Sequence, residues 1–349
     1  MNDVSFKFYT NGHDILQGML DEIASATESI ELEQFSFHDD AIGRRFLELF
    51  EKKLHEGVRI RIIADSMNSQ PLFQSPYVGE LEKQGLEIMQ FNPVSFVSPK
   101  QAFFRMHKKI LVVDSKIAWV GGLGLKKKFA DFRDTQVRLT GIIVDRIREA
   151  FEIIWQNQIP SKIQEVGSEN HFKFLVNYNG FEKKEIYEWM RSSIISAKKH
   201  IYITTSYFYP DRNFFQLILN KAREGLDIKL ILRGKNDEFA TIRFSASFFS
   251  EALSSGIEIY RYKPAIMHAK IMIIDEAATV GSSNLDKFSS YYNLEANVAS
   301  TDPVFVNELK NQFFADLRQS HKLTLKEWKL RPVFERFLEV VAWPFHNYL

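Results

Sequence analysis

Two nine-residue stretches, MHKKILVVD at 106–114 and MHAKIMIID at 267–275, share the pattern H-x-K-x4-D. Between their polar residues both are apolar and rich in branched side chains, which is typical of a buried strand. Side chains alternate between the faces of a strand, so the His and the Lys of each stretch point the same way. The Asp has the opposite parity and lies at the strand end. The two stretches therefore predict two equivalent strands that present the same polar groups.

The segments before these stretches also repeat. Gly57 and Gly225, which follow predicted helices, are 168 residues apart, and Gly85 and Gly256, which precede predicted strands, are 171 apart. Strands alternate with helices, which indicates an α/β layered fold, and a repeat of this length indicates duplication of a whole domain. The elements expected are helices over 14–27, 41–56, 184–199 and 213–224, and strands over 30–37, 58–63, 201–208 and 226–232.

A polar stretch between Gln156 and Glu169, with one proline and one glycine, separates the two repeats. Such composition is typical of a domain boundary. We therefore expect an N-terminal half over residues 1–160, and a C-terminal half over residues 168–349 that ends in a helical tail.

The composition excludes several classes of protein. Lys and Arg total 45 and Asp and Glu total 44, giving a formal net charge of +1, whereas a dedicated nucleic-acid-binding protein would carry a basic excess. A local basic groove remains compatible with this balance. The absence of cysteine excludes disulfides, thiolate catalysis and cysteine-ligated zinc. The N-terminus lacks the layout of a signal peptide and no run approaches the ~18 apolar residues of a membrane span, so we expect a chain that does not cross membranes.

A glycine turn and then an acid follow each H-x-K-x4-D stretch. The turns are GGLG at 121–124 and GSSN at 281–284, and the acids, Asp134 and Glu295, each lie 27 residues after the His. A single His, Lys or acid in such a place usually has an ordinary structural role. Their joint recurrence at matching spacing favours a shared chemical role in one site.

A metal site built from the two His and the two acids is the competing interpretation. A lysine two residues after each His places positive charge where a cation would bind. We therefore expect no metal.

The paired motifs resemble those of the phospholipase D superfamily. The resemblance extends from about Ile15 to Leu317, and it implies two similar α/β/α sandwich halves with mixed sheets, related by a pseudo-twofold axis around one active site, with no cofactor. Four flanking segments, IGRRFL at 42–47, GVRIR at 57–61, RDT at 133–135 and VGSSNLD at 280–286, resemble the bacterial cardiolipin synthase branch of this superfamily. Two features of the supporting loops depart from the usual pattern. Position 124 is Gly where this branch usually has Asn, and five residues separate Asp275 from Gly281 where the family usually has six.

Phosphodiester chemistry suits these residue types. Lys109 and Lys270 would donate to the non-bridging oxygens as charge develops in the transition state. One neutral imidazole would attack phosphorus and form a phosphohistidine, while the other protonates the leaving alkoxide and then accepts the proton of the incoming alcohol or water. The residues alone do not decide between the two histidines. The resemblance implies His107 as the nucleophile and His268 as the acid and base.

The remaining polar residues of the motifs would support this chemistry. Asp134 and Glu295 are the expected partners of the second ring nitrogen of the histidines, by the logic of a hydrolase triad. Parity and resemblance give Asp114 and Asp275 a structural role in their own loops. Further groups expected near the phosphate are the side chains of Ser283 and Asn284 and the backbone of Gly122.

Three aromatic segments favour a lipid substrate in this chain of 31 Phe. Residues 91–105, with four Phe and two Pro, could line an acyl-chain entrance, and residues 239–249 could form an interfacial helix. Residues 328–348 mix aromatic with basic side chains, as a peripheral membrane anchor does. For each segment, packing in the core is the alternative.

We therefore expect a phosphatidyltransferase that acts on phospholipids from the cytoplasm as a peripheral membrane protein, without nucleic acid. The resemblance implies that two phosphatidylglycerols give cardiolipin and glycerol. Alternatives are a phospholipase D-type hydrolase, a nuclease of the same superfamily, and a non-enzymatic membrane scaffold with vestigial motifs, which the intact His and Lys of both halves argue against.

Overall fold

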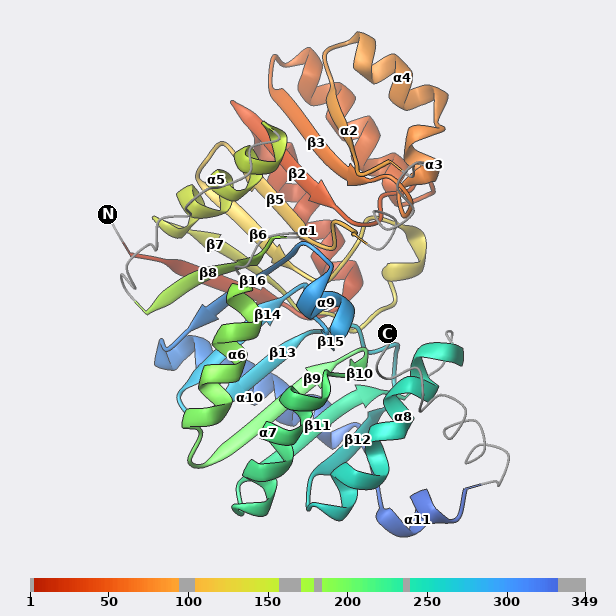
Figure 1. Ribbon diagram of the computed structural model, residues 1–349. Helices are drawn as coiled ribbons and strands as arrows, with labels where there is room; N and C mark the ends of the chain where they lie inside the picture. Colours follow the sequence, from red (N-terminus) through yellow and green to blue (C-terminus); the bar gives the residue numbers. More distant parts are fainter. Residues whose placement is uncertain (1–2, 94–103, 157–170, 179–183, 235–238, 332–349) are drawn as a thin grey trace.

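The computed structural model describes residues 3–93, 104–156, 171–178, 184–234 and 239–331, the last range without the side chains of 239–244. Two mixed sheets, each with helices packed on both faces, form two similar halves. The N-terminal half, red to yellow in Figure 1, lies above the C-terminal half, which is green to blue. The two sheets contact each other through strands near one edge of each sheet.

The N-terminal sheet has seven strands in the order β1-β7-β6-β5-β2-β3-β4. β2, β3 and β4 are parallel to one another, and the other pairings are antiparallel. The elements of this half are β1 (Ser5–Tyr9), α1 (Gly12–Ser25), β2 (Ser29–Gln34), α2 (Gly43–His55), β3 (Arg59–Asp65), α3 (Gln70–Phe73), α4 (Pro76–Lys83), β4 (Glu87–Phe91), β5 (Lys109–Val113), β6 (Ile117–Gly121), the 3-10 turn Lys127–Phe129, β7 (Gln136–Thr140) and α5 (Ile143–Trp155).

The C-terminal sheet repeats this order and adds one edge strand: β17-β12-β11-β9-β13-β14-β16-β8. A separate two-stranded pairing joins β10 to β15. The elements are β8 (Phe172–Asn177), α6 (Glu185–Ser196), β9 (His200–Thr205), β10 (Phe208–Tyr209), α7 (Arg212–Arg223), β11 (Asp227–Arg233), α8 (Phe239–Ser254), β12 (Glu258–Tyr262), β13 (Ile271–Ile274), β14 (Ala277–Gly281), β15 (Leu285–Asp286), α9 (Lys287–Tyr291), β16 (Glu295–Ser300), α10 (Pro303–Arg318), β17 (Ser320–Leu323) and α11 (Leu325–Lys329).

The predicted helices and strands are present with shifted ends. Gly57 and Gly225 end α2 and α7 with φ of +83° and +91°, a backbone conformation that side chains disfavour. The strand predicted over 201–208 is wrong in its last part, because β9 stops at Thr205 and the chain continues as β10. The predicted domain boundary falls in residues 157–170, which lie outside the described ranges.

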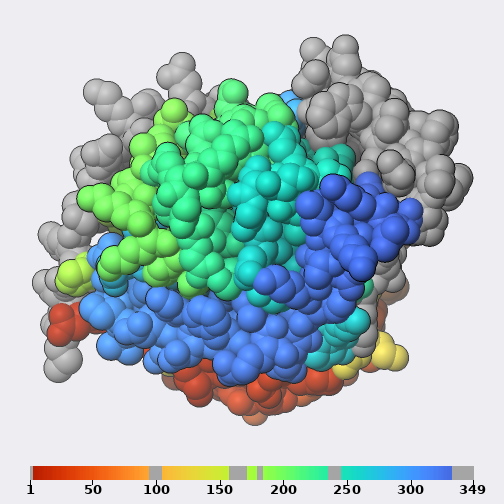
Figure 2. Space-filling view, turned by 90° about the horizontal axis from the view of Figure 1, so that it is seen from below, coloured from red at the N-terminus to blue at the C-terminus, as the bar shows by residue number. Residues whose placement is uncertain are grey.

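One hydrophobic core joins the two halves. Val120 and Val137 of the N-terminal sheet and Val280 and Val298 of the C-terminal sheet are fully buried in the same cluster, together with residues of α5 and α10. In Figure 2, seen from below, the C-terminal half covers this face and red residues of the N-terminal half emerge at the lower edge. Burial of this apolar area holds the two sheets together.

In the part of the chain that the structure describes, every helix is too short or too polar to span a bilayer.

Candidate active site

The segments that carry the two histidines pair with the opposite half. Met106 forms a bridge with Leu294, and the His107 N–H donates to the Leu294 carbonyl at 2.9 Å. Met267 forms a bridge with Arg133, whose carbonyl accepts the His268 N–H at 2.7 Å. The predicted strands around the His residues are therefore shorter than expected: β5 begins at Lys109 and β13 at Ile271. The backbone just before each strand, at residues 106–107 and 267–268, instead pairs with the other half.

This crossing brings each histidine to the acid of the other half. His107 Nδ1 lies 2.9 Å from Glu295 Oε1 and 3.0 Å from Oε2. His268 Nδ1 lies 2.6 Å from Asp134 Oδ2. Both carboxylates are fully buried. A carboxylate at Nδ1 keeps the proton on that nitrogen and leaves the Nε2 lone pair for a substrate.

Burial lowers the pKa of both imidazoles, which are 8% and 9% exposed for His107 and His268. At His268, burial and the charge of Lys270 outweigh Asp134 and lower the pKa to about 3. At His107, burial and the charges of Lys109 and Lys270 outweigh the attraction of Glu295. Both imidazoles are therefore neutral in the unliganded site at neutral pH. The influence of Lys270 on His107 also shows that groups of the two halves share one electrostatic environment.

The two lysines are buried beside the histidines. Lys109 Nζ donates to the His107 carbonyl at 2.5 Å, and Lys270 Nζ donates to the His268 carbonyl. Burial lowers the pKa of Lys109 to about 7 and that of Lys270 to about 8, and each lysine feels both buried acids. A bound phosphodiester anion would restore the charged form of both. In the described residues, no group of three or more His, Asp or Glu is arranged to hold a metal ion.

The two acids are held differently. Ser282 Oγ donates to Glu295 Oε2 at 2.5 Å and accepts from the Ala296 N–H at 3.0 Å. Asp134 Oδ1 instead accepts from the Thr135 N–H at 2.7 Å. Gly122 takes the place of the serine in the first turn, where an added Cβ would lie 2.6 Å from Asp134 Oδ1. Ser282 was not predicted, although a serine at the position of Gly122 in the other turn would have indicated it.

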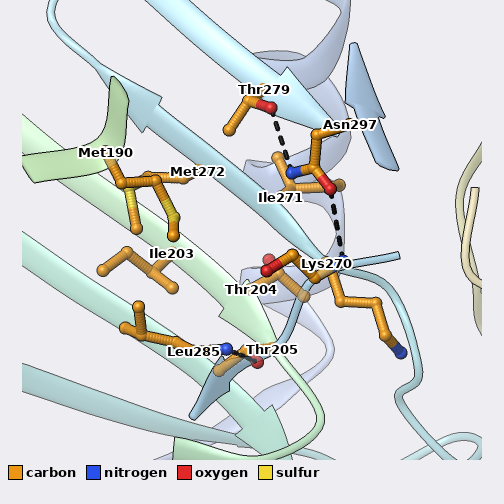
Figure 3. A pocket seen from close by; sticks show the side chains of 11 residues that line it. Met190, Ile203, Thr204, Thr205, Lys270, Ile271, Met272, Thr279, Leu285 and Asn297 are labelled. Atoms are coloured by element: carbon orange, nitrogen blue, oxygen red, sulfur yellow. Dashed lines mark hydrogen bonds between the residues drawn. The ribbon is translucent and has the colours of Figure 1, made fainter. Parts of the chain in front are cut away.

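The second glycine turn is held by a hydrogen bond to Asn297. The Asn297 amide accepts the Ser283 N–H at 3.2 Å and donates to Thr279 Oγ1 at 3.1 Å, as Figure 3 shows. Lys270, Ser283 and Asn297 line a cavity of about 10 Å³, and Figure 3 shows the Lys270 side chain extending away from the other labelled side chains. Asn284 Oδ1 is buried and makes no hydrogen bond to the described residues. Ser283 and Asn284, the predicted phosphate donors, thus lie on a hydrogen-bonded turn, and Ser283 lines the same cavity as Lys270.

The two motif aspartates lie at the far ends of β5 and β13, away from the histidines. Asp114 accepts backbone N–H groups of 27–29, and Asp275 those of 198–200. Both have positive φ, 51° and 48°. Each therefore ties a sharp turn to the start of the neighbouring strand.

Aromatic rings cover the other faces of the histidines. Phe35 packs edge-on against His107 with ring centroids 4.6 Å apart. Phe129 stacks on His268 at 5.7 Å, and Phe132 contacts the same ring at 5.8 Å. These neighbours were not predicted, because they come from loops with no motif.

The three aromatic segments expected to meet lipid are only partly described. In α8, Phe248 and Phe249 are buried in the core, which is the alternative weighed for that segment. Trp328 is also buried and contacts Phe249. Residues 94–103 and 332–349, which hold most of the other two segments, lie outside the described ranges.

Comparison with known proteins identifies the family. The model of a family described as cardiolipin synthase, PLD-like domain, matches residues 19–166 and 190–317. The chain belongs to this family. The resemblance inferred from the motifs, the fold of two similar α/β halves and the enzyme class are thereby confirmed.

Relatives in this family match almost the whole chain. The chain is 30% identical to the probable cardiolipin synthase YwiE of Bacillus subtilis (strain 168), in an alignment that covers 97% of this chain and 71% of YwiE. It is 29% identical to the major cardiolipin synthase ClsA of the same organism, and that alignment covers 97% of this chain and 74% of ClsA. Among solved structures, it matches a phosphatidylserine synthase of Haemophilus influenzae Rd KW20 with a TM-score of 0.74 and 14% identity, over 98% of this chain and 93% of that one. At such identity the likeness shows the fold alone.

Proposed function

We propose that this enzyme is a cardiolipin synthase-like phosphatidyltransferase that converts two phosphatidylglycerols into cardiolipin and glycerol. The observation that carries the proposal is the crossed arrangement, in which each buried histidine is held by the acid of the other half and stands beside a buried lysine. The relatives named cardiolipin synthase support the choice of substrate.

The first half-reaction transfers the phosphatidyl group to the protein. His107 Nε2 attacks the phosphorus of the donor, a P–N bond forms, and the P–O bond to the glycerol headgroup breaks. His268 gives its proton to the leaving glycerol oxygen. Since burial keeps His268 neutral in the empty site, that proton is taken up together with the anionic phosphodiester, whose charge offsets the burial.

The second half-reaction releases the lipid. A hydroxyl group of the acceptor phosphatidylglycerol attacks the phosphohistidine and gives its proton to His268. The P–N bond breaks, which returns His107 to its neutral form, and His268 releases the proton to solvent when the anionic product leaves the site. Water in place of the acceptor would give phosphatidic acid, the reaction of a hydrolase.

Four further side chains have supporting roles in this mechanism. Lys109 and Lys270 donate to the non-bridging oxygens, where charge develops in the transition state. Glu295 and Asp134 position the imidazoles and stabilise their charged forms. The substrates place the enzyme at a membrane surface, on which it would act from the cytoplasm as a peripheral protein.

Product analysis tests the proposal. Purified protein is incubated with phosphatidylglycerol vesicles and, separately, with single- and double-stranded nucleic acid. We expect cardiolipin from the wild type and from His321→Ala, a control at a histidine 43% exposed in its side chain, but none from His107→Ala or His268→Ala. Cleavage of nucleic acid without lipid turnover would contradict the proposal.

A further inference from the structure

A buried ion pair joins the two halves next to the acid that holds His268. Arg133 Nε donates to Asp316 Oδ1 at 3.0 Å, and Arg133 Nη2 donates to Asp316 Oδ2 at 2.6 Å. Arg133 directly precedes Asp134, whereas Asp316 lies in the last turn of α10, and both members of the pair are buried. Two parallel bonds between a planar guanidinium and a carboxylate fix both groups in one orientation. We call Arg133 and Asp316 the arginine clasp.

The arginine clasp also holds the backbone that follows Asp134. Arg133 Nη1 donates to the Asp134 carbonyl, and it lies 2.8 Å from Thr135 Oγ1 and 3.0 Å from the Thr10 carbonyl. The Thr135 N–H in turn donates to Asp134 Oδ1 at 2.7 Å. The guanidinium therefore fixes the peptide on which the Asp134 carboxylate rests, and with it the direction of that carboxylate.

His268 depends on the same segment through its backbone and through its ring. The Arg133 carbonyl accepts the His268 N–H at 2.7 Å, and the Arg133 N–H donates to the Ile266 carbonyl at 3.0 Å. The ring atom His268 Nδ1 lies 2.6 Å from Asp134 Oδ2. One arginine thus orders both the chain that carries the imidazole and the carboxylate that the imidazole contacts.

The equivalent position in the other half has no charge. Leu294 directly precedes Glu295, as Arg133 precedes the first acid, and its side chain packs in an apolar cluster. Glu295 is instead held by its own side-chain contact with Ser282. An ion pair at this position therefore supports the acid of His268, while the acid of His107 is supported by a serine.

We propose that the arginine clasp is a positioning device that orients His268 for proton transfer to the leaving group. The inference rests on the proposed function, in which His107 attacks phosphorus and His268 protonates the departing oxygen. Without the clasp, Asp134 would orient His268 less well and stabilise its charged form less, whereas the contact between His107 and Glu295 would remain. Loss of the clasp should therefore slow the departure of a leaving group that needs a proton, and spare one that does not.

The test compares two leaving groups in single turnovers, with enzyme in excess over lipid in mixed micelles, so that only the first half-reaction is followed. Phosphatidylglycerol releases glycerol, whose oxygen takes a proton as the P–O bond breaks. Phosphatidyl-p-nitrophenol releases p-nitrophenolate, a stable anion that leaves without a proton. Arg133→Leu/Asp316→Leu removes both charges together and so leaves no unpaired buried ion. Relative to p-nitrophenolate release, this variant should slow glycerol release by about tenfold or more, part of the ~10²–10⁴-fold that general acid catalysis supplies.

Two further variants accompany the test. Arg138→Leu/Glu22→Leu removes another arginine that donates twice to a carboxylate, between β7 and α1 within the N-terminal half, and should keep the wild-type ratio of the two rates. Asp316→Asn keeps the shape of the clasp but removes its negative charge. It should shift the ratio in the same direction by a smaller factor, and it repeats the test should the double variant fold poorly.

The outcomes separate this inference from the proposed function. Equal slowing of both releases would show that the clasp only supports the structure, and it overturns the inference, as does an unchanged ratio. Stronger slowing of p-nitrophenolate release overturns it as well, because the clasp would then act on the attack by His107. A wild type that releases glycerol but makes phosphatidic acid and no cardiolipin contradicts the proposed function, whereas the ratio of the two rates still decides the inference.

Discussion

Each half of the molecule contributes an imidazole, an ammonium group and a carboxylate to the proposed site, but the contacts that hold the carboxylate differ between the halves. In the C-terminal half the acid is Glu295, held by Ser282, whereas in the N-terminal half it is Asp134, beside Gly122. The backbone pairings that cross between the halves are the same on both sides. Duplication has thus preserved the positions of the proposed reacting groups, while the contacts around them have diverged.

A second difference between the halves concerns the residue between the His and the Lys of each motif, and its partner on the neighbouring strand. Lys108 and Glu33 are fully buried and 2.6 Å apart. Ala269 takes the place of the lysine in the second motif, and Thr204 occupies the position of the glutamate in β9. Burial raises the pKa of Glu33 even though Lys108 opposes this. One half therefore contains a buried ion pair where the other has small side chains.

Replacing either histidine should have the largest effect. His107→Ala and His268→Ala should each lower kcat by about 10⁴-fold or more, and the double variant should lose little further activity, because the two act as one unit. Cardiolipin formation by the three variants measures this. Retention of about half of the activity in each single variant, with the rest lost only in the double variant, would mean that the halves work as separate sites.

Removing one member of the buried ion pair should cost most in stability. Lys108→Ala leaves the Glu33 carboxylate buried without its cation, which should lower the free energy of unfolding by about 3–5 kcal/mol. Lys108→Ala combined with Glu33→Thr copies the other half and should recover part of this loss. Urea unfolding of both variants provides the measurement, and a double variant less stable than the single one would refute the comparison.

Replacing each acid by its amide tests whether each histidine pairs with the acid of the other half. Glu295→Gln and Asp134→Asn keep the shape but remove the charge that stabilises the imidazolium, so each should lower kcat by about 10²-fold. In imidazole ¹⁵N NMR spectra, Glu295→Gln should shift the signals of His107 and leave those of His268, and Asp134→Asn should do the reverse. Shifts confined to the histidine of the same half would show that the pairs are not crossed.

A change of pH should act in opposite directions on activity and stability. The ammonium groups of Lys109 and Lys270, with pKa values lowered to about 7 and about 8, are lost as pH rises, so kcat/KM should fall above this range. Between about pH 7 and the ordinary lysine pKa, the unfolded chain binds more protons than the folded one, so stability should rise with pH.

A lysine variant isolates this contribution. Lys109→Met removes the titrating group, so the stability of the wild type relative to this variant should rise between pH 7 and about 10. Denaturant midpoints of both proteins at several pH values measure the difference. A constant difference would show that the Lys109 pKa is not lowered by folding.

Much of the site could be predicted from the sequence, because the polar residues recur in two apolar strands at one spacing. His107, Lys109 and their counterparts in the second motif stand out for this reason. The recurrence of these residues did not indicate the order of the strands in the sheets. The period between Gly57 and Gly225 was nevertheless enough to predict a duplicated α/β domain.

Other features could not be predicted, since they depend on how the two sheets face each other. The partner of His107 is Glu295, 188 residues away, and spacing within one half points to no such pairing. Phe35 and Phe129 reach the histidines from loops without a motif. Ser282 differs from Gly122 by one side chain, whose importance emerges only next to the carboxylate.

Binding of orthovanadate, which mimics pentacoordinate phosphorus, tests the central claim of one shared site most directly. Isothermal titration calorimetry would give the number of vanadate ions bound by the wild type, His107→Ala and His268→Ala. We predict one vanadate per chain, with binding lost in either variant. Two vanadates per chain, one of which is retained by each variant, would contradict the account.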